Sequence, residues 1–471
     1  MIAGQSSILG VYNFLEENER LTEQQLATRQ RHLLHTQLEY ARSRSPYFSN
    51  LLRGVPTGEL LSSPDRWHGL PFMDKAVLLE NFDVVRTRPD IPHQAVSTYL
   101  DDRSRADEPF NDSDDLLVVS TAGTSGKPGH FVYDRAEQAH IRAQYFRLMR
   151  AVLAAVRPDG PLRSAAIIVT GAHMIGYKMQ RHLPPEYFQM IPVLRDGRPV
   201  TVEETAASLE EFAPHILTCF GSTLRMLIEY KEANPGFSWR PLALINTGAT
   251  LDKDLVSRAA AAFDGVRVFD LYGSTDTGYL AWTCEQGSMH LNTDCALIEV
   301  LDEQGRPVPA GQVGSIVISS FWHRTLPIVR YRLGDLISLG KDPCACGRSL
   351  PVVGELLGRE NTLLYRRSGR DLHPVPQGVF MELFENIAGV KRFRLVQEAV
   401  DRVSVLVEPL PGAGVDVGDR VTHRVAPVFG EGCSVEVSVV DTIPASPSGK
   451  FLPVERRFDP ATTRTSAAGT A

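Results

Sequence analysis

The chain has 471 residues, of which 43% are hydrophobic and 22% charged, and its formal net charge is -7 at pH 7. This length exceeds one ordinary hydrophobic core, so we expect two or three structural units. The acidic balance argues against a broad nucleic-acid surface, and no apolar run approaches the roughly 18 residues of a membrane span. We therefore expect small-molecule partners, with neither nucleic acid nor membrane among them. Residues 1–10 lack a basic segment followed by a long apolar one, which favours a cytoplasmic protein with reduced thiols.

The first predicted elements are scaffold. Leucines recur at helical spacing over residues 21–44 and predict an amphipathic helix that ends at Ser45-Pro46. A short helix follows Leu70, and residues 101–115 form an acidic, polar surface segment. None of these stretches indicates chemistry by itself.

A turn at residues 120–128 combines hydroxyl residues, two glycines and one lysine. The apolar strand predicted at 116–119 and the strand at 131–133 make this turn the tip of a hairpin. Glycines allow backbone N–H groups to approach an anion, and hydroxyls and an ammonium group add donors, so we expect polyphosphate there. A Walker P-loop is excluded because Thr121 and Pro128 stand where it needs Gly and Ser or Thr. The alternative is a glycine-rich surface loop without a ligand.

Strands and helices then alternate, which predicts βα units around a parallel sheet. Ligands of such sheets bind beyond the carboxyl ends of the strands, where the loops here are rich in small and polar residues. We expect these loops to share one crevice. The predicted strands are 165–170, 215–220, 242–246 and 266–271, the helices 137–156, 224–231 and 252–263, and the loops 170–174, 221–223, 247–250 and 272–276.

From about Ala296 onward, short β-branched segments with turns predict a smaller β unit. Beyond Gly358 the pattern indicates a compact α+β domain of about 100 residues. The strands predicted in the β unit are 297–301, 314–319 and 326–331, and the later domain is expected to contain strands at 393–397, 403–407 and 434–440 and a helix at 420–428.

Five motifs in order, STAGTSGKPG, YGSTDTG, YRLGDL, LLGRE and PSGK, resemble the adenylate-forming superfamily of acyl-CoA synthetases and adenylation domains. The segments SPYFS, LPFMDK and CACGR resemble its phenylacetate-CoA ligase branch, and the resemblance covers about residues 20–457. It implies an α/β fold with a large adenylation domain at 1–358 and a small mobile α+β domain at 359–460. Residues 461–471 are expected to be a disordered tail.

The resemblance implies that a carboxylic acid reacts with ATP and Mg²⁺ to give acyl-AMP and pyrophosphate, and that the acyl group then passes to CoA. A carrier-protein thiol, an amine or another small nucleophile is the alternative acceptor. A second alternative is a relative that binds ATP without turnover. We expect a monomer or a homodimer.

Roles follow from the resemblance position by position. Lys450 is expected to be catalytic, with Asp276 as the catalytic ligand of magnesium. Asp335 is expected to hold the ribose, with Arg359 beside it, although Asp335 is equally typical of an ordinary turn. The full set expected to bind ATP is Thr121, Thr124, Ser125, Gly126, Lys127, Gly248, Ala249, Tyr272, Gly273, Thr275, Asp335 and Arg359.

The sequence departs from the superfamily pattern in two places. Asp276 stands where most relatives have Glu, one methylene longer. After the LGR motif, where relatives usually offer an acidic residue at the hinge, the chain reads Glu360 and then Asn361, so the polar contacts of the hinge are expected to differ. Both motivate the alternative without turnover.

Three cysteines and one histidine offer the number and type of ligands that a tetrahedral Zn²⁺ site requires, namely Cys284, His290, Cys344 and Cys346. Over 50 residues separate the two pairs, so unrelated free thiols are the alternative. Some members of the resembled branch carry this combination around a structural metal, which favours zinc. A site with four protein ligands has no open position, so its expected role is stability.

The acyl substrate is expected to be an aryl or arylalkanoic acid, by analogy with the branch. The residues expected to line its pocket are His173, Met174, Tyr177, Gly221 and Thr247. A loop histidine is also commonly a structural residue, so His173 has that second interpretation.

Overall fold

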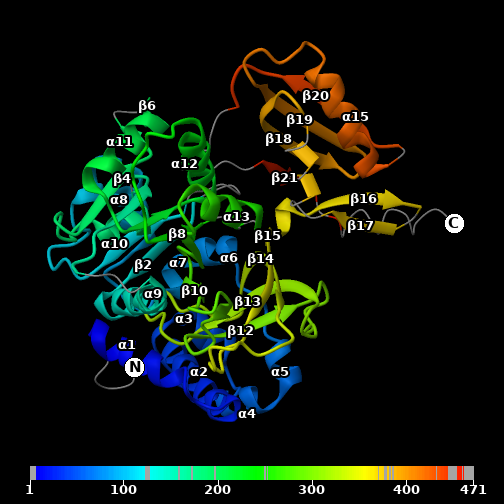
Figure 1. Cartoon of the computed structure of the whole chain (residues 1–471). Coiled ribbons are helices and arrows are strands. Elements are labelled where there is room, and N and C mark those ends of the chain that lie inside the picture. Colours follow the sequence, from blue (N-terminus) through cyan, green and yellow to red (C-terminus); the bar gives the residue numbers. More distant parts are fainter. Residues whose placement is uncertain are drawn as a thin grey trace. The chain divides into compact units, whose positions relative to one another are not determined.

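The computed structural model describes residues 7–121, 128–156, 160–170, 173–195, 198–248, 251, 253–369, 371–375, 379–380, 383–384, 387–430, 432–443, 453–458 and 460. Contacts divide the chain into two compact units (Figure 1). The first unit comprises Met1–Leu333 and Ile337–Glu355, and the second comprises Gly334–Leu336 and Leu356–Ala471. No described helix combines the length and apolar character that crossing a membrane would require.

The first unit begins with a series of helices. Helix α2 starts with a capping box, in which the Thr22 hydroxyl accepts from the Gln25 amide and the Gln25 side chain accepts from the Thr22 amide. It confirms the helix predicted at 21–44. The series is α1 (Ile8–Asn18), α2 (Glu23–Arg44), α3 (Pro46–Leu51), α4 (Thr57–Ser62), α5 (Pro64–His68), α6 (Lys75–Glu80), α7 (Phe82–Val85), α8 (His93–Asp101) and the 3-10 helix η1 (Arg103–Asp107).

A seven-stranded mixed sheet forms the centre of the first unit, in the order β11-β10-β9-β8-β7-β3-β4. The strands from β9 to β4 are parallel, as the βα pattern predicts, and β10 and β11 add antiparallel strands at one side. The strands are β3 (Ser164–Ile168), β4 (Phe188–Pro192), β7 (Ile216–Cys219), β8 (Ala243–Thr247), β9 (Arg267–Ser274), β10 (Gly278–Thr283) and β11 (Met289–Leu291). A short ribbon joins β5 (Leu194–Arg195) to β6 (Arg198–Pro199).

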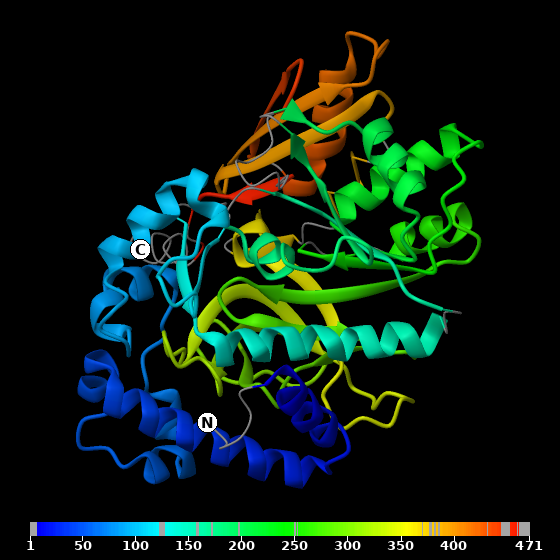
Figure 2. The same cartoon turned by 90° about the vertical axis from the view of Figure 1, so that its left-hand side faces the viewer.

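Alternating side chains bury both faces of this sheet. Leu217 and Leu244 pack with helices α11, α12 and α13 on one face. Ile216 and Ile245 pack with helix α9 on the other face, where Figure 2 shows this long helix running beneath the strands. The helices are α9 (Arg135–Val156), α10 (Ile175–Gln180), α11 (Val202–Phe212), α12 (Gly221–Ala233) and α13 (Lys253–Ala262).

A second sheet has the order β12-β13-β14-β15. The strand predicted at 326–331 is wrong, because β14 begins only at Tyr331. Pro327 offers no N–H for a ladder, and Arg330 has a left-handed φ of 47°. Its buried guanidinium instead donates to the carbonyl oxygens of Trp67, His68 and Leu70. The strands are β12 (Ala296–Leu301), β13 (Val313–Ser320), β14 (Tyr331–Leu339) and β15 (Val353–Arg359).

The second unit is an α+β domain, in which four strands in the order β20-β19-β18-β21 carry helix α15. Val421 and Val425 of the helix are fully buried against Leu395 and Val405 of the sheet. The predicted strands at 393–397, 403–407 and 434–440 and the helix at 420–428 are confirmed within these elements. The unit contains η2 (Glu360–Thr362), β16 (Leu364–Ser368), β17 (Asp371–Val375), β18 (Val390–Ala399), β19 (Arg402–Pro409), α15 (Val417–Phe429), β20 (Ser434–Val439) and β21 (Val454–Arg456).

Candidate functional site

The glycine-rich turn stands on an antiparallel hairpin. Strand β1 (Leu117–Ser120) pairs with β2 (His130–Tyr133), with Ser120 opposite His130. Thr121 closes the base, since its amide donates to the Gly129 carbonyl at 2.9 Å and its hydroxyl accepts from the Gly129 amide at 2.7 Å. Thr124, Ser125, Gly126 and Lys127 lie outside the described residues, as do Ala249, Lys450 and the tail expected at 461–471.

The loops after β3, β7, β8 and β9 lie at one edge of the sheet, because these strands are parallel neighbours. Gly221 is the buried first residue of α12, and Thr247 ends β8 with its hydroxyl 3.2 Å from the Leu271 carbonyl. Gly248 follows with a φ of 71°, a conformation that glycine adopts without strain. Below them, Asn246 donates to Asp270 at 2.8 Å, and burial raises the pKa of Asp270 to about 6.

The segment after β3 is tied to the hairpin and to the acidic segment before it. The Ser120 amide donates to the His173 carbonyl at 2.9 Å. The His173 ring, 3% exposed, has Nε2 2.9 Å from the Asp102 carbonyl oxygen, and burial lowers the pKa of His173. Tyr177 donates to Asp107 at 2.5 Å, and Met174 directly precedes α10. The His173 Nε2 atom and the Tyr177 hydroxyl thus hold the 102–107 segment in place.

Lys178 is a buried residue that the sequence analysis missed. Its ammonium group lies 4.5 Å from the centroid of the Tyr99 ring and donates to the Tyr99 hydroxyl. Burial lowers the pKa of Lys178 to about 8. The sequence signal that could have indicated its burial is a lysine among apolar residues on the short helix α10.

The Tyr-Gly-Ser-Thr-Asp segment runs from β9 into the next turn. Tyr272 is buried on β9. Gly273 has no room for a side chain, because a Cβ there would lie 2.5 Å from the Gly278 carbonyl oxygen on β10. The Thr275 carbonyl accepts a hydrogen bond from the Tyr133 hydroxyl of the hairpin. This bond joins the end of β9 to the strand that returns from the glycine-rich turn.

Asp276 is 8% exposed, and the Tyr331 hydroxyl donates to its Oδ2 atom at 2.6 Å. Burial, and then the Asp276 charge, raise the pKa of Tyr331 well above its ordinary value, so this phenol remains a donor. These two residues lie 55 positions apart, and no sequence motif connects them. A fixed carboxylate at the end of β9 is suited to holding a divalent cation.

Asp335 and Arg359 form an ion pair in the second unit. Arg359 Nε lies 2.8 Å from Asp335 Oδ1, and the carboxylate side chain is 9% exposed. Asp335 lies on β14, directly after Gly334, whose φ is 80°. The structure thus brings together the two residues that the resemblance assigned to the ribose, and Asp335 is part of a strand and not of a simple turn.

The four expected zinc ligands converge. The ligand atoms of Cys284, His290, Cys344 and Cys346 all lie within 4.8 Å of one another. The Cys284 and Cys344 sulfurs are 3.7 Å apart, close to the ~3.8 Å that two thiolates at about 2.3 Å from a tetrahedral zinc would have. His290 Nε2 lies 3.3 Å from the Cys346 sulfur, while its Nδ1 lies 2.9 Å from the Leu350 carbonyl oxygen. That second contact orients the ring as is usual for a metal-bound histidine.

The thiols of this cluster differ in acidity. Burial raises the pKa of Cys284 to about 12. Burial also opposes ionisation of Cys344, but hydrogen bonds from Ser288 and from the Cys346 amide outweigh it and lower the pKa of Cys344 to about 6. A bound cation is what would allow both thiols to ionise together.

A buried network of charges supports the cysteine segment. Arg348 Nε lies 2.6 Å from Glu19, which also pairs with Arg147 at 2.8 Å. Arg147 in turn makes a bidentate pair with Asp294, at 2.7 and 3.1 Å. The network joins α1 and α9 to the residues that flank the cluster. Sequence patterns gave no signal for it beyond charged residues on amphipathic helices.

Comparison with known proteins agrees with this architecture. The AMP-binding enzyme family model matches residues 74–322, and the CapK C-terminal domain model matches 369–457. The phenylacetate-coenzyme A ligase of Thermus thermophilus is 27% identical over 264 residues, which are 55% of this chain and 57% of that protein, so the match spans just over half of the ligase. Protein CapK of Staphylococcus aureus is 20% identical over 348 residues, 71% of this chain and 73% of that protein.

A solved structure of 2-hydroxyisobutyryl-CoA ligase in the postadenylation state shares the fold, with a TM-score of 0.68 and 18% identity over 96% of this chain and 94% of that one. The AMP-binding model alone covers more than half of the chain. The protein therefore belongs to the AMP-binding enzyme family, and with it to the adenylate-forming superfamily that its motifs indicate.

Proposed function

We propose that the protein uses ATP to convert a carboxylic acid into an acyl-adenylate, with release of pyrophosphate, and then transfers the acyl group to CoA. The observation that carries this proposal is the geometry at the end of β9. Asp276 is buried and oriented by Tyr331, while Thr275 is tied through Tyr133 to the hairpin below the glycine-rich turn. This arrangement, in a member of the AMP-binding family, supports a nucleotide site at this edge of the sheet.

In the proposed reaction, a carboxylate oxygen attacks the α-phosphorus and pyrophosphate leaves. Both partners are anionic, so the site must supply cations and fixed donors that act where charge builds up. We assign the pyrophosphate to the turn formed by Thr121, Thr124, Ser125, Gly126 and Lys127. We assign magnesium to Asp276, which would neutralise phosphate charge, and the attacking carboxylate to Lys450.

The remaining contacts to ATP follow from the strand ends. Thr275 would meet the α-phosphate, and Tyr272, Gly273, Gly248 and Ala249 would surround the adenine. The Asp335–Arg359 pair supports a ribose site, because a carboxylate already held by a guanidinium is positioned to accept from two neighbouring hydroxyls.

For the acid, we propose an aryl or arylalkanoic substrate. The support is the similarity to a protein named as a phenylacetate-coenzyme A ligase, together with the small residues Gly221 and Thr247 at the relevant strand ends. His173, Met174 and Tyr177 would line the pocket from the loop after β3. Tyr177 would contribute ring surface, since its hydroxyl already donates to Asp107. The buried Nδ1 atom of His173 has no hydrogen-bond partner among the described residues, so it would be available to a polar group of the acid.

We further propose that Cys284, His290, Cys344 and Cys346 bind one zinc ion with a structural role. The ligand set is complete without water, and the neighbouring network from Arg348 to Glu19 connects the cluster to α1. The metal would thus stabilise the end of β10 that Cys284 follows, whereas Asp276 precedes the other end of that strand.

A different acyl acceptor is the second candidate. The specific observation is that the C-terminal unit matches a domain family named for CapK, and that CapK aligns with more of this chain than the CoA ligase does. The C-terminal domain carries Lys450 and so takes part in the proposed reaction. An enzyme that uses an acceptor other than CoA is therefore expected to differ from CoA ligases in the sequence of this domain.

ATP–pyrophosphate exchange across a panel of aryl, arylalkanoic and short aliphatic acids tests the first step. We expect exchange with at least one aryl acid, and exchange only with aliphatic acids would refute the substrate assignment. Adding CoA to the active acid then tests the second step by mass spectrometry. Adenylate that accumulates without thioester would overturn CoA as the acceptor and favour the second candidate. Absence of exchange with every acid would contradict adenylation itself.

A further inference from the structure

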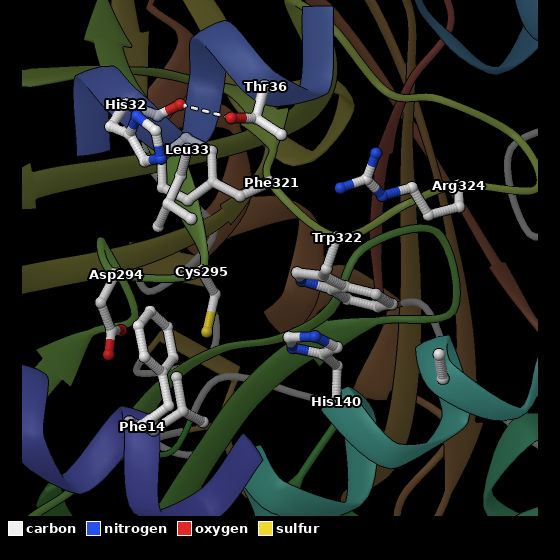
Figure 3. Close-up of a pocket in the computed structure, with 12 residues that line it drawn as sticks. Phe14, His32, Leu33, Thr36, His140, Asp294, Cys295, Phe321, Trp322 and Arg324 are labelled. Atoms are coloured by element: carbon white, nitrogen blue, oxygen red, sulfur yellow. Dashed lines mark hydrogen bonds between the residues drawn. The ribbon is translucent and has the colours of Figure 1, made fainter. Parts of the chain in front are cut away.

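We propose that the cavity between helices α1, α2 and α9 binds a small organic carboxylate, at a site separate from the nucleotide loops and independent of the proposed reaction. The cavity has a volume of about 210 Å³. Figure 3 shows α2, with His32 and Thr36, on one side of the cavity, and α1 and the start of α9, with Phe14 and His140, on the other side. The segment 321–324 also lines it.

A buried cation lines this cavity. Arg324 is 8% exposed, and Figure 3 shows its guanidinium extending toward Phe321 and Trp322. The guanidinium lies over the Tyr40 ring, 4.3 Å from the centroid. Among the described residues no carboxylate lies within ion-pair distance of it, and the Glu137 and Asp134 carboxylates act on it only from farther away. A desolvated guanidinium that faces a cavity favours an anionic ligand there.

Nearby carboxylates are already satisfied by other donors. Glu137 accepts from the amides of Arg324 and Thr325 at 2.6 and 2.9 Å, and from the Thr325 hydroxyl at 2.5 Å. These bonds fix the backbone that carries Arg324, so the cation is held in place before a ligand arrives. Asp294, which also lines the cavity, is neutralised by its bidentate pair with Arg147.

The other walls are mostly apolar. Phe14, Leu33, Phe321 and Trp322 contribute them, and His140 stacks on Trp322 with the ring planes 8° apart. Burial lowers the pKa of His140 to about 4, so this imidazole is neutral. One end of the cavity is therefore positive and the rest is suited to hydrocarbon.

The volume of the cavity limits the size of the ligand. An engineered apolar cavity of about 150 Å³ binds benzene, so about 210 Å³ accommodates one ring with a carboxylate group. Inorganic phosphate fits less well, because the apolar walls would leave most of its oxygens without donors. The chemistry points to a monocarboxylate with a compact apolar body.

The cavity lies beside the first turns of α9. Ala136 and His140 face it, whereas Leu148 and Val152 of the same helix pack against the strands. An acid bound here would not occupy the strand ends where Asp276 and Thr247 lie. The site thus adds a second place at which a carboxylic acid interacts with this protein.

Binding of 4-fluorobenzoate to the full chain without ATP, followed by fluorine NMR, tests the proposal. We expect saturable binding that Arg324→Gln weakens at least about tenfold, because a charge-assisted hydrogen bond is lost. Ala136→Phe fills the cavity and keeps the arginine, so it should abolish the saturable binding of 4-fluorobenzoate. The matched control, Arg44→Gln, removes an exposed arginine at the end of α2 and should leave binding unchanged.

Circular dichroism is the check that each variant is folded. If Arg324→Gln proves unstable, the binding measurement on Ala136→Phe decides the outcome. Inorganic phosphate should not displace the probe. Absence of saturable binding, or binding that survives both cavity substitutions, would overturn the proposal. Because the measurement needs no ATP and no turnover, its failure would leave the adenylation proposal unaffected.

Discussion

Replacing Arg147 with methionine removes a cation that the structure buries completely. Its guanidinium lies 2.7 Å from Asp294 and 2.8 Å from Glu19, and it also donates to the Asn292 side chain and the Leu15 carbonyl at 2.6 and 2.7 Å. Methionine has a similar length, so the change removes charge and donors with little loss of volume.

The expected loss of unfolding free energy depends on which partners each carboxylate retains in the variant. Glu19 retains ion pairs with Arg150 and Arg348, whereas Asp294 stays 2% exposed and retains the Asn18 amide at 3.2 Å. One buried carboxylate is thus left without its cation, which costs about 3–5 kcal/mol of unfolding free energy. Adding Asp294→Asn removes the stranded charge, so the double variant should be more stable than Arg147→Met alone.

Urea unfolding monitored by tryptophan fluorescence measures this effect. The four tryptophans, at 67, 239, 282 and 322, all belong to the first unit, so the signal reports that unit. Arg20→Met, at an arginine whose side chain is 78% exposed, is the control and should cost no more than about 0.5 kcal/mol. A loss below about 1 kcal/mol for Arg147→Met, or a double variant that is no more stable, would refute the reasoning.

Three further predictions follow from individual contacts. The free energy of unfolding of the wild-type protein, relative to that of Lys178→Met, should increase as the pH rises from about 8 toward 10. Burial lowers the pKa of Lys178 to about 8 in the folded protein, whereas the unfolded chain keeps that proton to higher pH. Urea titrations at the two pH values measure this difference, and a difference that stays constant would contradict the prediction. Tyr331→Phe should lower kcat/KM for pyrophosphate exchange about tenfold by releasing Asp276, and Tyr230→Phe should not; equal rates would remove Tyr331 from the site. Purified protein should contain one zinc per chain, and a chelator or Cys346→Ser should lower the thermal midpoint; a metal content far below one would count against the metal site.

Most secondary structure was predictable because local patterns determine it. Ile216 and Leu217 point to opposite faces of the sheet, and both faces are buried, so the strand appears as a continuous apolar run. The capping residues Thr22 and Gln25 mark the start of α2 in the same local way. The strand predicted at 326–331 failed because β-branched residues there outweighed the signal of Pro327, and the role of Arg330 depends on carbonyl groups some 260 residues earlier.

The residues proposed for the candidate site come from sequence motifs, but the partners that hold them do not. Motif resemblance identified Asp276, but its donor Tyr331 comes from a different strand and only the fold brings them together. Cysteine and histidine content suggested the metal ligands, yet their convergence within 4.8 Å depends on how β10 and β11 meet the 344–346 segment. The burial of Lys178 and of the Arg147 network could not be predicted from the sequence, because charged residues on helices are ordinarily exposed to solvent.

The central claim, attack of a carboxylate on the α-phosphorus of ATP, is tested most directly by isotope transfer. With an acid labelled with ¹⁸O in its carboxylate group, the bridging oxygen of the acyl-adenylate stays on phosphorus when the acceptor takes the acyl group. Mass spectrometry should therefore find one ¹⁸O in AMP and none in pyrophosphate. Label in inorganic phosphate, or AMP without label while product forms, would contradict adenylation.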